Sequence, residues 1–299
     1  MTSPVLPNFF ILGAAKAGTT TLYEVLKQHP QVYLSYVKEP MFFSHDENYR
    51  QGLGWYSRTF FPAAHKYPLR GEATPHYLYW AEKVAPRIRE AYGGTNLKFV
   101  IILRDPVQRA YSWYWNMVKE GKEDLPFAEA LEKEAERLRA HWDSLYATGS
   151  MVYGYYRGGC YASQIEEYFK YFSRESFYFL LQEDLKDLKH GTFPGLLEFL
   201  GVERQVEFKP VVANPAATPR SRTLHRWLHG PSALKELVKK IIPLRWRYHF
   251  KVLLTEANLQ AISYPRLDEV LAAELRKRYQ GEVERLEIII GRDLSSWKG

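Results

Sequence analysis

The sequence predicts a single α/β domain in which a central parallel sheet is flanked by helices. Short apolar runs alternate along the chain with stretches whose apolar residues recur at helical spacing. This alternation is the pattern of strand–helix–strand units, which bury a parallel sheet between helices. A loop of small residues joins the first strand to the first helix, as in P-loop-like phosphate sites. The chain has 299 residues, 46% of them hydrophobic, which is enough for one large core.

The first unit of this pattern lies within the first 30 residues. Residues 8–12 (NFFIL) form an apolar run that is typical of a buried parallel strand. Residues 13–18 are a small-residue loop around one lysine. Residues 19–28 carry apolar side chains at helical spacing, and Pro30 follows the expected helix end.

The later elements follow from the same signals. Residues 98–103 (KFVIIL) are the clearest strand, and Pro106 lies near the first turn of the helix expected over 107–119. The remaining predictions are strands over 31–36 and 176–181, a strand end with a turn over 71–75, and helices over 81–92, 127–145, 161–172 and 193–200. No repeat or clear domain boundary is visible, so residues 1–299 are expected to form one domain.

Composition narrows the class of protein. The single cysteine, Cys160, excludes an intramolecular disulfide and a cysteine-based metal site, and we find no metal-ligand spacing among the nine histidines. The first eight residues lack the features of a signal peptide, and the apolar runs are too short to span a bilayer, so a cytoplasmic location is expected. The net charge of +7 suits an anionic ligand, a nucleic acid or an acidic membrane, and does not choose among them.

Residues 13–21 (GAAKAGTTT) are the first segment that indicates chemistry. Small residues let backbone N–H groups approach an anion, and the following helix start adds unpaired N–H groups and a positive dipole end. Lys16 adds a cation, and the threonines add hydroxyl donors. The segment departs from the Walker A pattern, because the lysine comes two residues before Gly18 instead of directly after a glycine.

A second segment, residues 102–112 (ILRDPVQRAYS), places an arginine at a strand end and a serine eight residues later. Arg104 offers a fork of donors to phosphate oxygens, with an ion pair to Asp105 as the structural alternative. Ser112 lies about two helical turns further on. The two segments resemble the 5'-phosphosulfate loop and the 3'-phosphate motif of sulfotransferases that use 3'-phosphoadenosine-5'-phosphosulfate (PAPS).

The resemblance extends over most of the chain and is closest to the heparan sulfate sulfotransferases and their bacterial relatives. It also covers residues 38–43 (KEPMFF), 72–75 (EATP), 159–161 (GCY) and 291–294 (GRDL). It implies an enzyme that moves the sulfuryl group of PAPS in line to a hydroxyl or amine of a small-molecule, glycan or lipid acceptor, leaves 3',5'-adenosine bisphosphate (PAP) and needs no metal. The nucleotide-binding residues that it implies are Lys16, Ala17, Gly18, Thr19, Thr20, Thr21, Arg104, Ser112, Tyr161 and Arg220.

The resemblance also implies the catalytic residues. Glu39 matches the catalytic glutamate of the heparan sulfate branch and is expected to be the general base, with an ion pair to Lys16 or Lys38 as the structural alternative. Lys16 is expected to stabilise the leaving phosphate. His45 and His76 are alternative bases. Some relatives have histidine, aspartate and lysine at three positions that contact a sulfated sugar; this chain has Met41, Ser44 and Ala73 there, which leaves a heparan-like acceptor open.

Basic residues greatly outnumber acidic ones over residues 220–251, with aromatic residues between them. We interpret residues 219–255 as a basic helical lid, a surface for an anionic membrane or a site for an acidic polymer, with a solvated basic helix pair as the alternative. Two rival functions remain. A P-loop kinase or NTPase shares the strand–loop–helix arrangement but needs Gly-Lys-Ser/Thr. A nucleic-acid-binding protein fits the charge, but the sequence shows no recognition motif for one, and we expect no nucleic-acid partner. The sequence does not indicate an oligomeric state.

Overall fold

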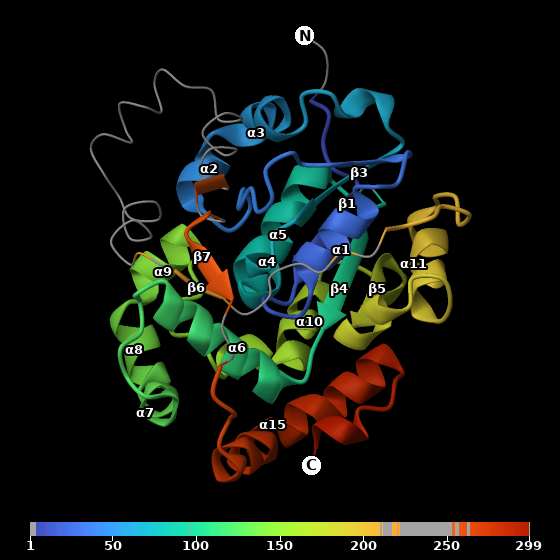
Figure 1. The fold of residues 1–299 in the computed structure, drawn as a ribbon. Helices are drawn as coiled ribbons and strands as arrows, with labels where there is room; N and C mark the ends of the chain where they lie inside the picture. Colours follow the sequence, from blue (N-terminus) through green and yellow to red (C-terminus); the bar gives the residue numbers. More distant parts are fainter. Residues whose placement is uncertain are drawn as a thin grey trace.

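The computed structural model describes residues 4–94, 96–209, 211, 217–219, 221, 253–254, 257–261 and 264–298. Its centre is a five-stranded sheet of order β2-β3-β1-β4-β5, in which every neighbouring pair is parallel (Figure 1). The strands are β1 Phe9–Gly13, β2 Val32–Leu34, β3 Leu69–Ala73, β4 Lys98–Leu103 and β5 Phe177–Leu181. The α/β class predicted from the sequence is confirmed.

Helices cover both faces of this sheet. The helices are α1 Thr19–Leu26, α2 Asp46–Arg50, α3 Gly52–Phe60, α4 His76–Tyr79, α5 Ala81–Tyr92, α6 Pro106–Lys119, α7 Phe127–Glu132, α8 Glu134–Ala140, α9 Trp142–Thr148, α10 Tyr161–Phe169, α11 Thr192–Leu200 and α15 Glu269–Ile290. Short 3-10 turns lie at Ala64–Lys66, Arg157–Gly159, Arg174–Ser176, Gln182–Lys186 and Ser295–Trp297. A separate antiparallel pair joins β6 Ala217–Pro219 to β7 Leu259–Ala261. None of the helices described is long and apolar enough to cross a membrane.

Alternate residues of β1 belong to two different cores. Phe10 and Leu12 pack into the larger core, to which α4, α5, α6, α10 and α15 contribute. Phe9 and Ile11 pack into the second core, formed with α1 and α11. Successive side chains of a strand point to opposite faces, so a strand buried on both faces must be apolar throughout. This explains why residues 9–12 of β1 form a continuous apolar run.

The long helix predicted over residues 127–145 is wrong: the segment forms the three short helices α7, α8 and α9. The last break is at His141, whose φ of −115° lies outside the helical range. A tertiary contact lies at the first break, between α7 and α8: the buried carboxylate of Glu134 accepts hydrogen bonds from the backbone N–H groups of Tyr156 at 2.6 Å and Arg157 at 2.8 Å. The charge pattern of the segment cannot reveal this contact.

The carboxyl ends of the strands form the edge where a ligand is expected. Strand β1 lies between β3 and β4, so the chain leaves it toward one side first and toward the other side later. In open parallel sheets such a switch point marks the ligand crevice. The small-residue loop follows β1 directly at this point.

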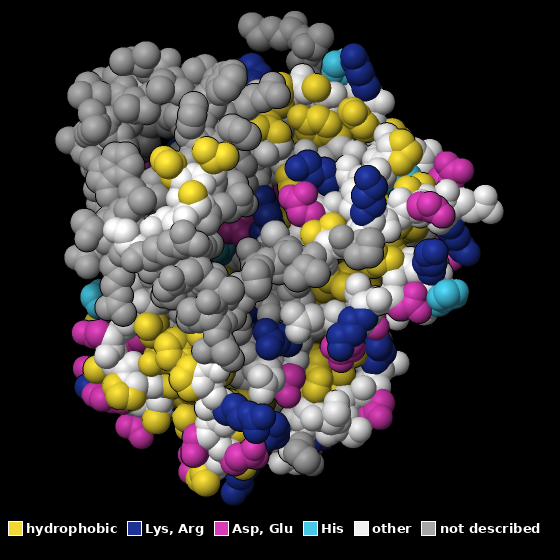
Figure 2. Space-filling model, in the orientation of Figure 1, with side chains coloured by type: hydrophobic (Ala, Val, Ile, Leu, Met, Phe, Trp, Pro, Cys, Tyr) yellow, Lys and Arg dark blue, Asp and Glu magenta, His cyan; other side chains and the backbone are white. Residues whose placement is uncertain are grey.

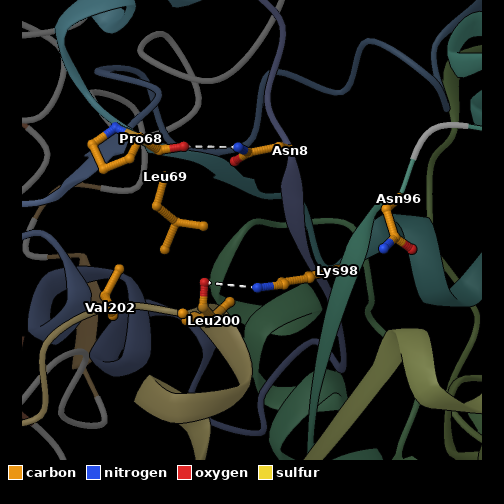
Figure 3. Close-up of a pocket in the computed structure, with 8 residues that line it drawn as sticks. Asn8, Pro68, Leu69, Asn96, Lys98, Leu200 and Val202 are labelled. Atoms are coloured by element: carbon orange, nitrogen blue, oxygen red, sulfur yellow. Dashed lines mark hydrogen bonds between the residues drawn. The ribbon is translucent and has the colours of Figure 1, made fainter.

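A pocket of about 250 Å³ lies at the other edge of the sheet, beside the amino ends of β1, β3 and β4 (Figure 3). Two of its polar side chains already have partners: Asn8 Nδ2 donates to the carbonyl oxygen of Pro68 at 2.8 Å, and Lys98 Nζ donates to that of Leu200 at 2.9 Å. These groups are occupied by the backbone, so this pocket is not our candidate site.

Candidate functional site

The loop after β1 has the shape of an anion cradle. Lys16 and Gly18 adopt left-handed backbone conformations, with φ of 71° and 107°. Gly18 is the N-terminal cap of α1, and no side chain caps the helix there. The first N–H groups of α1 therefore lack intrahelical partners and carry the positive end of the helix dipole. Gly13 is required at the loop start, because a Cβ atom there would lie 2.7 Å from Cβ of Leu78.

Two cations meet at this loop. Arg104 directly follows β4, and its Nη1 donates to the carbonyl oxygen of Lys16 at 3.2 Å. Tyr161 donates its hydroxyl proton to the carbonyl oxygen of Arg104 at 3.0 Å and so fixes the backbone of the arginine. Burial, together with the positive charges of Lys119 and Arg104, lowers the pKa of Lys16 to about 8. Burial and mutual repulsion both disfavour the charged form of these cations. Cations held close together in spite of this are typical of anion sites.

Glu39 follows β2 and lies beside the end of β3, where its backbone N–H donates to the carbonyl oxygen of Ala73 at 3.1 Å. Its carboxylate pairs with Lys38 Nζ at 2.5 Å. Burial opposes ionisation of this carboxyl, but the charges of Lys38, His76 and Lys16 more than offset it and leave its pKa below the usual value. The ion pair proposed as a structural alternative therefore forms with Lys38, and the carboxylate is ionised near neutral pH.

His76 lies at the start of α4, next to the Glu39 side of the site. Burial lowers the pKa of its imidazole although the charge of Glu39 works against this. Its Nδ1 is buried and has no hydrogen-bond partner among the described residues. The ring lies edge-on to Trp113 of α6, with centroids 6.4 Å apart. Buried polar atoms nearly always have a hydrogen-bond partner, so this unpaired nitrogen at the margin of the site is a candidate contact for a ligand.

The remaining residues predicted to bind the nucleotide differ in how deeply they are buried. Ala17 and Thr19 are buried, whereas Thr20 and Thr21 are half-buried in the first turn of α1. Ser112 is half-buried on α6, two turns beyond Arg104. Tyr161 is buried in the core, and its contact with Arg104 is the hydrogen bond to the arginine's backbone carbonyl. Arg220 lies outside the described residues, as do most of residues 219–255.

Two residues near the site were missed from the sequence. Lys119, at the end of α6, adds to the positive charge around Lys16. The sequence signal for it was its spacing: it follows Ser112 by seven residues, about two helical turns, and so lies on the same face of the helix. Glu72 is fully buried at the end of β3 and accepts hydrogen bonds from three hydroxyl groups, those of Tyr56, Thr74 and Tyr77. Within the described part of the chain, no group of three or more His, Cys, Asp and Glu side chains could hold a metal ion.

Comparisons with known proteins agree with this geometry. A family model described as the sulfotransferase domain matches residues 6–226. Heparan sulfate glucosamine 3-O-sulfotransferase 3B1 of Mus musculus is 30% identical over 210 residues, which are 69% of this chain and 49% of that protein. Heparan sulfate glucosamine 3-O-sulfotransferase 5 of Homo sapiens is 33% identical over 189 residues, 62% of this chain and 51% of that protein. The chain thus matches about half the length of these curated relatives.

A solved structure extends the likeness to nearly the whole chain. The crystal structure of a sulfotransferase from Alicyclobacillus acidocaldarius covers 99% of this chain and 100% of its own, with a TM-score of 0.71 and 28% sequence identity. The anion cradle after β1, the arginine after β4 and these matches lead to one conclusion. The chain belongs to the sulfotransferase family.

Proposed function

We propose that the protein transfers a sulfuryl group from PAPS to a hydroxyl or amine of an acceptor and releases PAP. The observation that carries this proposal is the meeting of Lys16 and Arg104 at the uncapped start of α1, where no ion pair neutralises either of them among the described residues. Such a place is built for an anion. Family membership makes a phosphosulfate the natural occupant.

The nucleotide would span the carboxyl edge of the sheet. Its 5'-phosphosulfate would lie on the backbone N–H groups of residues 17–21, beside Lys16. Its 3'-phosphate would lie between Arg104 and Ser112. Arginine is suited to this role because its planar fork matches two phosphate oxygens at once. Arg220 stays a prediction for the same nucleotide.

In the proposed reaction a bond forms between the acceptor oxygen or nitrogen and sulfur, and the bond between sulfur and the 5'-phosphate oxygen breaks. Lys16 balances the negative charge that appears on the leaving phosphate, and Glu39 takes the acceptor proton. The pair with Lys38 makes Glu39 a weak base in the free protein. Binding of an anion beside Lys16 opposes the positive potential at Glu39, and so raises the proton affinity of its carboxylate when the reaction needs it.

The acceptor class is also part of the proposal. The names of the relatives, heparan sulfate glucosamine 3-O-sulfotransferases, favour a glycan hydroxyl. Two of the three positions at which some relatives contact a sulfated sugar, Ser44 and Ala73, are fully buried in this chain, which favours other sugar contacts. Recognition would therefore fall to groups such as His76. A cytoplasmic location and contact with an anionic membrane stay predictions.

Calorimetric titration with PAP, run beside ATP and magnesium, tests the proposal. We expect PAP to bind and Mg-ATP to bind weakly or not at all. Binding of Mg-ATP together with indifference to PAP would favour the rival kinase or NTPase. On the face shown in Figure 2, Lys and Arg side chains of the described residues are interspersed with Asp and Glu.

A further inference from the structure

The segment that carries Glu39 has an unusual backbone. Glu39 and Met41 both adopt left-handed conformations, with φ of 61° and 54°. Residues with a side chain adopt this region rarely, and they keep it only where the surroundings hold it. We call residues 38–43 the Glu39 segment. The direction of the Glu39 carboxylate depends on whatever holds this segment in place.

Hydrogen bonds from several elements hold the Glu39 segment. The carbonyl oxygens of Met41 and Phe43 accept from the backbone N–H of His45 at 2.9 Å and from Arg87 Nη1 at 3.1 Å, and three further bonds add to these. The backbone N–H of Glu39 donates to the carbonyl oxygen of Ala73 at 3.1 Å. Asn48 Nδ2 donates to the carbonyl oxygen of Pro40 at 3.1 Å. The backbone N–H of Phe43 donates to the hydroxyl oxygen of Tyr77 at 3.1 Å. This last anchor is the one made by a fully buried side chain from another helix, α4.

The Tyr77 hydroxyl can accept from Phe43 because its own proton points elsewhere. It donates to Glu72 Oε1 at 3.0 Å. Glu72 is fully buried, and its two oxygens also accept from Thr74 at 2.8 Å and from Tyr56. Burial raises the pKa of Glu72 to about 7. In its ionised form the carboxylate only accepts, so it fixes the direction of every hydroxyl that meets it. Glu72 thereby turns the lone pairs of the Tyr77 oxygen toward the Glu39 segment.

We propose that Tyr77, oriented by Glu72, is a positioning residue that fixes Glu39 for sulfuryl transfer. The proposal rests on the proposed function and deepens it. Tyr77 is fully buried, so it acts through the segment and does not touch the substrates. A small displacement of a catalytic group lowers the rate of the chemical step, whereas binding of the nucleotide is unaffected.

Tyr56 offers a matched control. Its hydroxyl donates to the same oxygen of Glu72, and its side chain is also fully buried. Its hydroxyl accepts no hydrogen bond from the Glu39 segment among the hydrogen bonds described. Tyr56→Phe and Tyr77→Phe each remove one buried hydroxyl from one carboxylate and keep the aromatic ring. They differ in the link to Phe43.

The experiment compares wild type with the two variants in three measurements: thermal unfolding, calorimetric titration with PAP, and release of ³⁵S-sulfate, equimolar with PAP, from ³⁵S-labelled PAPS with water as the acceptor. We expect similar losses of Tm in both variants and PAP affinity within about threefold of wild type. Release of PAP should fall at least about tenfold in Tyr77→Phe and less than about threefold in Tyr56→Phe.

Equal loss of turnover in the two variants, or a Tyr77→Phe defect that follows weaker PAP binding, would overturn the positioning role. If Tyr77→Phe does not fold, Glu72→Gln replaces it, because an amide oxygen orients Tyr77 less strongly than a carboxylate. Its turnover should then fall more than that of Tyr56→Phe. A wild-type protein that neither binds PAP nor releases it from PAPS would instead refute the proposed function on which this role rests.

Discussion

Binding of PAP should draw a proton onto Lys16. In the unliganded protein, burial and the neighbouring charges of Lys119 and Arg104 lower the pKa of this amine from 10.5 to about 8. A bound phosphate reverses the effect, because an anion within a few ångströms favours the charged form. The pKa of Lys16 should therefore rise on binding, and the nucleotide should bind the protonated form.

The size of the effect follows from the pKa. Near pH 8 about half of the free protein carries a neutral Lys16, so each PAP bound should bring roughly half a proton from the buffer. The affinity should fall as pH rises, by about tenfold between pH 7 and pH 9, because the neutral fraction grows through that window. The phosphates of PAP, with a second pKa of about 6, are already ionised there and add little.

Calorimetry of PAP binding in buffers with different ionisation enthalpies measures this proton uptake directly. Lys16→Arg is the diagnostic variant, since a guanidinium stays charged throughout and should abolish both the uptake and the pH dependence. Lys122→Ala is the matched control, because Lys122 is half-exposed and already paired with Glu120 at 2.7 Å. No proton uptake near pH 8 in wild type, or the same uptake in Lys16→Arg, would refute the reasoning.

Three further substitutions separate binding, chemistry and folding. Arg104→Ala should weaken PAP binding by about 10–100-fold in calorimetry, because a charge-assisted hydrogen-bond partner is lost; unchanged affinity would remove Arg104 from the site. Glu39→Gln should bind PAP normally and release it from PAPS at least about 100-fold more slowly, and normal turnover would exclude it as the base. Gly71→Ala should lower Tm by several degrees, since its Cβ would meet the buried ring of Phe9; an unchanged Tm would show that the ring can move aside.

The local signals in the sequence were reliable where one physical cause acted alone. The run at residues 98–103 is apolar and β-branched because β4 is buried on both faces, and the structure places the strand over the same residues. The C-terminal helix α15 was missed although its signals are present: Asp268 caps its start by accepting from the N–H of Leu271 at 2.9 Å, and Gly291 ends it in a left-handed conformation.

The sequence by itself determined the fold class, the small-residue loop and the arginine after β4, because each depends on neighbours in the chain. Tertiary structure alone decided the charge state of the site. The low pKa values of Lys16 and Glu39 arise from burial and from charges on other elements. The carboxylate of Glu72 meets Tyr56 and Tyr77 only once β3, α3 and α4 have packed. Electrostatic interactions depend on distance in space and on exclusion of water, and neither quantity can be obtained from the spacing of residues along a chain.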